Sequence, residues 1–310
     1  MSGVAIITGA SGFVGTALRA YFKKERWDVF ACDLAAGDRM AACDVTDPRQ
    51  VAATFNAAED EFGPPTHVFH LAAITSVPEA VRAPEQTLRV SRDGTENVAR
   101  AILERGAKTR LVYISSSEVY GAPLTLPVNE MHPVAPLNPY AASKAAAEAV
   151  CANYAGEGLD VIVMRPFNHT GPGQDARFAL PAFARQIALI EAGKMEPAMR
   201  TGNLDARRDF LHVNDVLRAY EKAALWGRAG ETYNVCSGES RRIGDALEKL
   251  LSRARADIEV HPDPELMRPS DIADIYGSYA KVRSDTAWEP AATFEEMLAE
   301  LLDYWRTQLY

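Results

Sequence analysis

The chain has 310 residues, 47% of them hydrophobic, and a formal net charge of −9 at pH 7 with a pI near 5.3. This length and apolar content suffice for one large domain or two smaller ones, and an acidic chain without a basic cluster is a poor partner for nucleic acid. No stretch has the length of a membrane span, no signal peptide precedes the first strand-like run, and the four cysteines lack disulfide or metal-ligand spacing, so we expect a cytoplasmic protein with reduced thiols and no metal.

The N-terminal residues predict a dinucleotide site. A buried strand over residues 3–8 leads into the turn Gly9-Ala-Ser-Gly-Phe-Val-Gly15, and a helix follows from Phe13 to Lys24. The glycines let the turn tighten, let the backbone approach a pyrophosphate and let the helix pack closely on the strand. The helix N-terminus offers amides and a dipole to the phosphates. The candidate cofactor residues of this turn are Gly9, Ser11, Gly12, Phe13, Val14 and Gly15.

The second predicted strand, residues 27–32, ends at Asp33. An acidic side chain at this place can hydrogen-bond a ribose 2′-hydroxyl and repels a 2′-phosphate. We therefore expect NAD(H) or NADP(H) as the cofactor, with NAD(H) favoured. Arg39 lies close enough in the sequence to soften this preference.

Apolar runs then alternate with helical periodicity through the first half of the chain. Further strands are predicted at residues 67–72, 110–115 and 161–165, and helices at 51–61, 87–105 and 139–155. This alternation predicts an α/β fold with a doubly wound, Rossmann-type parallel sheet, in which ligands sit beyond the carboxyl ends of the strands. Additional candidate cofactor residues at those ends are Asp44, Val45, Leu71, Ala72, Ala73, Pro166 and Asn168.

Tyr140 and Lys144 are four residues apart on a predicted helix, so both side chains share one face. A nearby ammonium favours a phenolate, so we expect Lys144 to lower the pKa of Tyr140 from its usual value of about 10. A serine such as Ser116, in the run Ser115-Ser-Ser-Glu-Val-Tyr-Gly121, can hold a substrate oxygen beside the phenol. Together the three groups can exchange a proton with an alcohol or a carbonyl oxygen.

After Arg165 the pattern loosens into a turn-rich segment, residues 166–174. Helices are predicted at 178–193, 243–255 and 294–309, another begins near Asn214 or Asp215 as N-cap, and a strand covers 231–236. We expect residues 1–165 plus about 209–236 to form the dinucleotide-binding domain. Residues of about 166–208 plus 237–310 would form a smaller, interleaved C-terminal α/β lobe that binds the substrate.

These motifs carry a resemblance to a known family over nearly the whole chain. The glycine triplet, Tyr140-x-x-x-Lys144 and Val119-Tyr-Gly121 resemble the extended short-chain dehydrogenase/reductase superfamily, which acts mostly on nucleotide sugars. Five further stretches are similar to the GDP-4-keto-6-deoxy-D-mannose reductases, which reduce the C4 ketone to give GDP-D-rhamnose. These stretches are residues 165–174, 184–187, 202–210, 233–238 and 267–270. The GDP-mannose 4,6-dehydratases share fewer of them.

The resemblance implies an NAD(P)H-dependent 4-ketoreductase with a GDP-linked sugar as substrate. Tyr140 would be the general acid, Ser116 would hold the C4 oxygen, and Lys144 would also contact the nicotinamide ribose. Glu118 is counted with the catalytic residues because a glutamate at this place removes the C5 proton in the dehydratases. Arg208 and Arg268 would clamp the diphosphate. The candidate substrate-binding residues are Thr75, Ser117, Glu118, Asn168, Arg185, Asn203, Arg208 and Arg268.

Two rival functions remain open from the sequence. A nucleotide-sugar 4,6-dehydratase or epimerase uses the same Ser/Tyr/Lys set but recycles its NAD(P) internally, and Glu118 does not decide between these reactions. A non-catalytic dinucleotide-sensing scaffold is disfavoured because Ser116, Tyr140 and Lys144 are all present. The chain also departs from the superfamily at Ser91, where an asparagine usually positions a proton-relay water. We expect a homodimer, since the helices over 87–105 and 139–155 often form a dimer seam in this superfamily.

Overall fold

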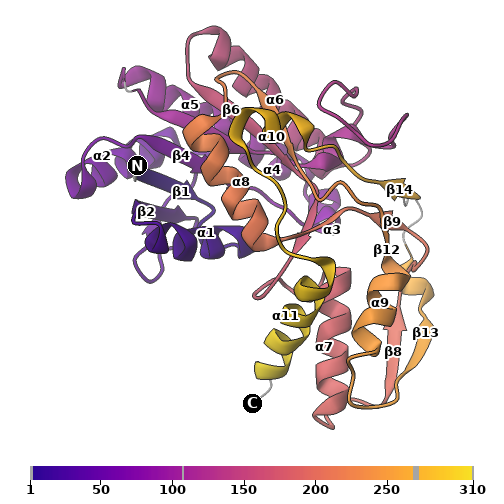
Figure 1. The fold of residues 1–310 in the computed structure, drawn as a ribbon. Helices are drawn as coiled ribbons and strands as arrows, with labels where there is room; N and C mark the ends of the chain where they lie inside the picture. Colours follow the sequence, from indigo (N-terminus) through magenta and orange to yellow (C-terminus); the bar gives the residue numbers. More distant parts are fainter. Residues whose placement is uncertain (1–2, 107, 268–271, 309–310) are drawn as a thin grey trace.

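A seven-stranded parallel sheet forms the centre of the protein in a computed structural model that describes residues 3–106, 108–267 and 272–308. Its strands follow the order β11-β6-β5-β4-β1-β2-β3, and every neighbouring pair is parallel. Figure 1 labels β1, β2, β4 and β6 of this sheet. The strands are β1 (Val4–Thr8), β2 (Asp28–Asp33), β3 (Ala41–Ala42), β4 (His67–His70), β5 (Arg110–Ile114), β6 (Val161–Pro166) and β11 (Thr232–Val235). The predicted Rossmann-type sheet is therefore confirmed.

Helices cover both faces of this sheet. One face packs against α1 (Phe13–Lys24), α8 (Val213–Trp226) and α10 (Ala280–Thr286). The other face packs against α2 (Pro48–Phe62), α5 (Gly94–Glu104) and α6 (Pro139–Gly156). Strands β1, β5 and β6 are buried along most of their length, which explains why their sequences are largely apolar runs without polar alternation.

The direction of winding changes at β1. Strands β2 and β3 extend the sheet on one side of β1, whereas β4, β5, β6 and β11 extend it on the other. Because β2 and β4 lie on opposite sides of β1, a crevice opens beyond the carboxyl ends of β1 and β4. Ligands of doubly wound sheets bind at this place. The glycine-rich turn after β1 lies at this crevice.

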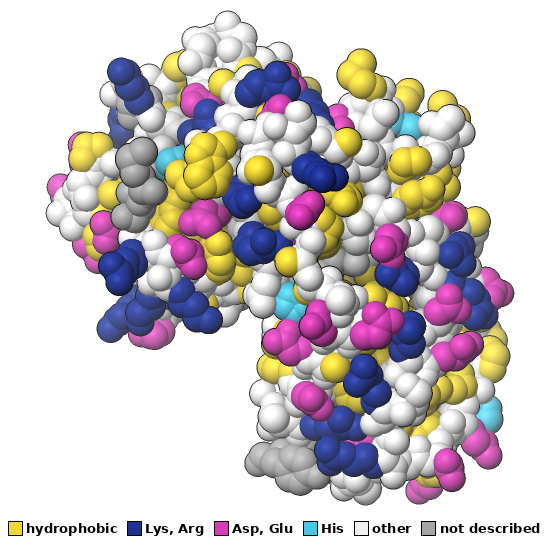
Figure 2. Space-filling view, viewed as in Figure 1, with side chains coloured by type: hydrophobic (Ala, Val, Ile, Leu, Met, Phe, Trp, Pro, Cys, Tyr) yellow, Lys and Arg dark blue, Asp and Glu magenta, His cyan; other side chains and the backbone are white. Residues whose placement is uncertain are grey.

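Elements from the second half of the chain form a smaller lobe. Its core joins α7 (Ala179–Glu191), α9 (Ile243–Leu251) and α11 (Phe294–Thr307) with the parallel pair β8 (Ala198–Thr201) and β13 (Glu259–Pro262). Figure 1 places these elements together below the sheet, and Figure 2 shows them as a smaller mass joined to a larger one. This is the interleaved lobe that the loose second half of the sequence suggested.

The two-part division with the boundaries given above stays a proposal, and we place α10 with the sheet. Val282 and Trp288 are fully buried in the core on the α1/α8 face. Asp209 connects three segments of the chain, because its buried carboxylate accepts from the amides of Ser237, Gly238 and Gly277. The chain therefore passes more than once between the lobe and the sheet.

The remaining elements are short. Three of them contact α6: α3 (Val77–Arg82), α4 (Pro84–Leu88) and the 3₁₀ turn η2 (Ser117–Tyr120). Another 3₁₀ turn, η3 (Pro264–Leu266), lies in the lobe. The small strand pairings are β7 (Asn168–Thr170) with β10 (Phe210–His212), and β9 (Arg207–Arg208) with both β12 (Arg241–Arg242) and β14 (Asp274–Ile275).

Two local predictions are wrong in detail. Helix α8 is capped by His212, whose Nδ1 accepts from the Asn214 amide at 3.0 Å, and not by Asn214 or Asp215. Asp215 is buried and instead accepts from the amides of residues 291 and 292. The single helix expected over 87–105 is α4 and α5 joined by a π-helical segment, η1 (Arg89–Asp93), which contains Ser91. π-helical segments are rare and frequent at functional sites.

Close packing behind the glycine-rich turn generates a stability prediction. A Cβ at Gly15 would lie 2.3 Å from the Gly9 carbonyl oxygen, whereas a Cβ at Gly156 meets nothing within 4 Å. We expect Gly15→Ala to lower the free energy of unfolding by about 1–3 kcal/mol, because backbone must shift. Gly156→Ala, the matched control, should be neutral or stabilising by up to about 1 kcal/mol. Urea unfolding checks both, and equal stabilities would contradict the tight helix–strand contact.

Candidate active site

The helix that carries Tyr140 and Lys144 begins at Asn138. Its side-chain oxygen accepts from the Ala141 amide at 2.8 Å, and Pro139 occupies the first helical position. Both features favour a helix start at this residue. Tyr140 therefore lies in the first turn of α6, with Lys144 one turn further along the same face.

Lys144 is a buried cation held against the end of β5. Its side chain is 2% exposed, and its Nζ donates to the Ile114 carbonyl oxygen at 2.7 Å. The ammonium also lies 5.1 Å from the centre of the Tyr113 ring. Burial lowers the pKa of Lys144 to about 8, although Glu148 and Cys151 oppose this effect. Lys144 is thus cationic at neutral pH with little margin.

Ser116 and Glu118 stand opposite the first turn of α6. The strand β5 ends at Ile114, and Ser116 caps η2 by accepting from the Glu118 amide at 3.2 Å. The Glu118 carboxylate accepts from the Asn138 side-chain amide at 2.9 Å. Asn138 therefore caps α6 and holds Glu118 at the same time, which fixes η2 relative to Tyr140.

The pKa of Tyr140 is raised, not lowered as we expected from Lys144. Burial is the main cause, the negative charge of Glu118 adds to it, and a hydrogen bond with Ser116 partly opposes it. The Lys144 ammonium points to the Ile114 carbonyl and is not among the groups that set this pKa. At neutral pH Tyr140 therefore keeps its proton and can act as an acid.

The glycine-rich turn has the shape that a dinucleotide needs. Gly9 has φ +68°, and a Cβ there would lie 2.7 Å from the Ala72 amide nitrogen, so both conformation and space require glycine. At Gly12 a Cβ would meet only the Gly9 carbonyl oxygen, at 3.4 Å. The protein's own packing leaves that side of Gly12 open at the N-terminus of α1, where phosphates bind. These residues fit a bound dinucleotide cofactor.

Asp33 is attached directly to this turn. One of its carboxylate oxygens accepts from the Ser11 amide at 2.9 Å and from the Ser11 hydroxyl at 2.7 Å, and the other accepts from the Leu34 amide. The end of β2 is thereby fixed beside the helix N-terminus. Its negative charge lies where a ribose would follow the phosphates.

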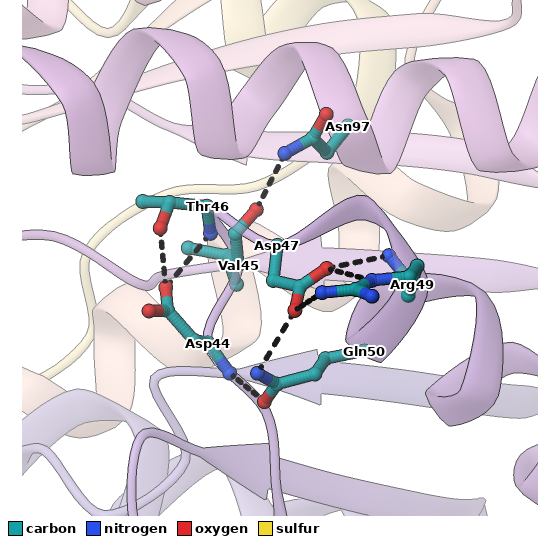
Figure 3. A network of polar contacts seen from close by, with 7 residues as sticks. All are labelled: Asp44, Val45, Thr46, Asp47, Arg49, Gln50 and Asn97. Atoms are coloured by element: carbon teal, nitrogen blue, oxygen red, sulfur yellow. Dashed lines mark hydrogen bonds and ion pairs between the residues drawn. The ribbon is translucent and has the colours of Figure 1, made fainter.

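The segment after β3 is held by a polar network (Figure 3). Asp44 accepts from the amide and hydroxyl of Thr46, while its own amide donates to the Gln50 side chain. Asn97 of α5 donates to the Val45 carbonyl oxygen at 3.0 Å. Asp44 and Val45, predicted cofactor residues, thus occupy a rigid loop next to Asp33.

Other predicted cofactor residues follow β4 and β6 in the chain. Leu71, Ala72 and Ala73 follow β4, and the Ala72 amide donates to the Thr8 hydroxyl at 3.3 Å. Phe13 of the glycine-rich turn stacks on His169, with 6.1 Å between ring centres. This contact joins the turn to the segment after Pro166, on which Asn168 is exposed. The stack gives His169 a structural role.

The predicted substrate residues are only partly brought together. Thr75 is exposed between β4 and α3, and Ser117 is buried in η2 beside Ser116. Arg208 donates from Nη1 to the Ile272 carbonyl oxygen at 2.6 Å. Asn203 accepts from the Asp205 amide in the loop before β9.

Arg185 is exposed on α7, with its guanidinium over the Trp305 ring of α11 at 6.0 Å. This contact lies at the surface of the lobe, so the structure does not unite Arg185 with Ser116 or Tyr140. Arg268 lies outside the described residues.

Sequence reasoning missed Asn138 and Glu148 as site residues. Asn138 could have been found, since asparagine followed by proline ahead of a helical pattern is a start signal. Among the described residues, no group of three or more His, Cys, Asp or Glu is placed to hold a metal ion. In the same part of the chain, no helix is long and apolar enough to cross a membrane.

Comparison with known proteins identifies relatives over nearly the whole chain. The family profile described as GDP-mannose 4,6 dehydratase matches residues 6–301. The GDP-6-deoxy-D-mannose reductase of Pseudomonas aeruginosa is 38% identical over 308 residues, which cover 98% of this chain and 97% of the relative. The GDP-6-deoxy-D-talose 4-dehydrogenase of Aggregatibacter actinomycetemcomitans is 28% identical, with 89% of each chain covered. The resemblance stated from the motifs is confirmed.

Solved structures show the same architecture. RMD from Pseudomonas aeruginosa, solved in complex with NADPH, superposes with a TM-score of 0.86 at 37% identity, covering 99% of this chain and 100% of that one. The UDP-glucose 4-epimerase of Thermus thermophilus, in complex with NAD, gives a TM-score of 0.85 at 28% identity over 98% and 99% of the two chains. Both NADPH and NAD thus occur among the structural relatives, consistent with an NAD(P)(H) site.

The position of Asp33 generates a prediction about cofactor choice. Asp33→Asn keeps an oxygen acceptor for Ser11 but removes the negative charge that repels a 2′-phosphate. We expect the ratio of affinities for NADPH over NADH to rise about tenfold. Fluorescence titration with both cofactors measures this ratio. Asp28→Asn, at the opposite end of β2, is the control, and an unchanged ratio in Asp33→Asn would remove Asp33 from ribose recognition.

Proposed function

The chain belongs to the GDP-mannose 4,6-dehydratase family, and within it we propose that this protein is an NAD(P)H-dependent reductase of GDP-4-keto-6-deoxy-D-mannose that yields GDP-D-rhamnose. The observation that carries this proposal is the 38% identity, over 98% of this chain, to a GDP-6-deoxy-D-mannose reductase. The same similarity supports the substrate class. A ketone reduction needs an acid at the forming alkoxide, and burial together with Glu118 keeps the proton on the Tyr140 phenol.

The residues divide the work at the C4 oxygen. The Ser116 hydroxyl would hold that oxygen, and Tyr140 would donate its proton to it as the bond order falls. Lys144, fixed on Ile114, would supply positive charge below the phenol and bind the cofactor ribose. A reduced nicotinamide cofactor, bound at the turn from Gly9 to Gly15, supplies the hydride for this chemistry.

The nucleotide end of the substrate would lie toward the lobe. Asn168 is exposed on β7, which pairs in parallel with β10 through Asn168 and Phe210. This pairing brings β7 to the strand that starts two residues after Arg208, so an amide and a guanidinium can both face a diphosphate. Thr75, Ser117, Asn203 and Arg185 complete the proposed substrate residues, and Arg268 is retained on its sequence match.

A dehydratase reaction differs in what it asks of Glu118. That reaction needs Glu118 as a free base at C5 and recycles its cofactor, so net NAD(P)H is not consumed. Here the Glu118 carboxylate is bound to Asn138, and it acts on Tyr140 by raising its pKa. A carboxylate that already accepts from Asn138 is not a free base in this structure, which supports a reductase over a dehydratase.

We also propose a cytoplasmic homodimer that associates through α5 and α6. The exposed part of α6 carries small side chains, at Ala142, Ala149 and Ala152. Small residues on a helix face allow two helices to approach closely. The family resemblance, in which these two helices form a seam, is the second support.

Removing the phenol hydroxyl tests the proposed acid. Tyr140→Phe should lower kcat for ketone reduction by about 10²-fold or more, the usual loss when a positioned acid is removed. Oxidation of NADPH or NADH with the 4-keto sugar measures it. Tyr154→Phe, on the same helix but outside the site, should retain activity. Near-normal turnover in Tyr140→Phe would exclude Tyr140 from the mechanism.

A charge on the proposed seam tests the dimer. Ala149→Arg should convert the protein to a monomer in analytical ultracentrifugation, because a desolvated unpaired guanidinium opposes association. Ala53→Arg, at an exposed alanine of α2, is the matched control and should leave the dimer intact. A monomeric wild type, or a dimeric Ala149→Arg variant, would contradict this seam.

A further inference from the structure

A buried ion pair lies one turn beyond Lys144 on α6. The Glu148 carboxylate accepts from Arg165 Nε at 2.9 Å and from Arg165 Nη2 at 2.5 Å. The two side chains are only 11% and 7% exposed. Burying two charges carries a large desolvation cost, and removing one partner leaves the other charge unpaired. Glu148 is therefore a candidate for a specific role in the site.

Glu148 joins the helix to the elements that carry the rest of the site. The Ser115 hydroxyl, adjacent to Ser116 at the end of β5, donates to the same carboxylate. Arg165 precedes Pro166, the last residue of strand β6. Its guanidinium lies 4.8 Å from the centre of the Tyr120 ring in η2. A single carboxylate thus connects α6, β5 and β6, with η2 packed on its partner.

The spacing places Glu148 in line with the reacting groups. Tyr140, Lys144 and Glu148 follow one another at intervals of four residues, so they share one face of α6. The Ile114 carbonyl oxygen accepts from Lys144, and the hydroxyl of the next residue, Ser115, donates to Glu148. The helix is therefore fixed to the strand end at two successive points directly below Tyr140.

The charges around Lys144 give Glu148 a second effect. Lys144 faces His70 of β4 and Tyr113 of β5, and shares its helix with Cys151. Burial and the Lys144 charge lower the pKa of His70 to about 3, so His70 is neutral and adds no second positive charge beside the ammonium.

Glu148 does oppose the effect of burial on the pKa of Lys144. Glu148 itself faces Arg165, Tyr120 and Tyr113, of which only Arg165 is charged at neutral pH. Without its carboxylate, a buried guanidinium would remain unbalanced near the ammonium.

We propose that Glu148 is a positioning residue for this site: it holds the Tyr140–Lys144 face of α6 against the end of β5 through Ser115 and Arg165, with its carboxylate one helical turn from the Lys144 ammonium. The consequence for turnover rests on the proposed reductase function. The consequence for Lys144 does not, because the protonation state of a lysine can be measured without any substrate.

The test follows the Lys144 side chain by NMR in protein labelled with ¹³C at lysine Cε, with Lys144→Arg used to assign the signal. In Glu148→Gln we expect the titration midpoint of Lys144 to fall by about one pH unit, because a neutral amide no longer favours the cation. The decline of kcat on the alkaline side of the pH profile should therefore begin about one pH unit lower than in the wild type. If the wild-type protein has no reductase activity, the proposed function is wrong, but the NMR comparison of Lys144 still tests the role of Glu148.

A second buried pair provides the control. Glu191 of α7 accepts from Arg306 Nε and Nη2, both at 2.8 Å, with side chains 6% and 15% exposed. Glu191→Gln breaks a comparable pair in the lobe core and should leave the Lys144 midpoint where it is. An unchanged midpoint in Glu148→Gln, or the same shift in both variants, would overturn the proposal.

Ser115→Ala keeps the ion pair and tests the positioning effect if Glu148→Gln does not fold. We expect kcat to fall about tenfold with little change in the KM for cofactor, because only the fixation of α6 on β5 is loosened. The midpoint of Lys144 should stay within the wild-type range. Wild-type kcat in Ser115→Ala would contradict the link between Glu148 and the strand end.

Discussion

Much of this site depends on the burial of one charge. Lys144 is an ammonium with 2% of its side chain exposed, so its hydration must be replaced by protein groups. The Ile114 carbonyl oxygen and the nearby Glu148 carboxylate supply that replacement. Both are available only if α6 lies across the end of β5. This requirement sets the helix so that Tyr140, one turn earlier, stands beside Ser116.

Different groups set the pKa values of Tyr140 and Lys144, whereas the sequence led us to expect that Lys144 itself would control Tyr140. Glu118 and burial keep the proton on Tyr140, while Glu148 helps to keep the proton on Lys144. One carboxylate thus acts on the acid and a different one acts on the cation. This arrangement suits proton donation to a ketone, and each carboxylate is fixed by an amide or a guanidinium from another element.

The elements carrying this site were predictable because their signals are local. The glycine spacing after β1, the acid at the end of β2 and the four-residue interval from Tyr140 to Lys144 each depend on one turn of chain. The crevice followed from the alternation of strands and helices. Asn138 has a local signal too, as a helix cap followed by proline.

Other features depend on partners that are distant in sequence. Nothing in the sequence indicates that Asn138 holds Glu118, that Phe13 stacks on His169, or that Lys144 turns toward Ile114 instead of lowering the pKa of Tyr140. The cap at His212 is likewise supported by a tertiary contact, a bond from its Nε2 to Glu300 at 2.5 Å. Such pairings are decided by packing, which local pattern does not describe.

The central claim is that this chain reduces a ketone with net consumption of cofactor. The most direct measurement mixes the purified protein with GDP-4-keto-6-deoxy-D-mannose and NADH or NADPH and follows reduced-nicotinamide absorbance against product. We predict loss of one reduced cofactor for each GDP-linked 6-deoxyhexose formed. Conversion of GDP-mannose to a keto sugar without net cofactor change would contradict the account and make Glu118 the base of a dehydratase.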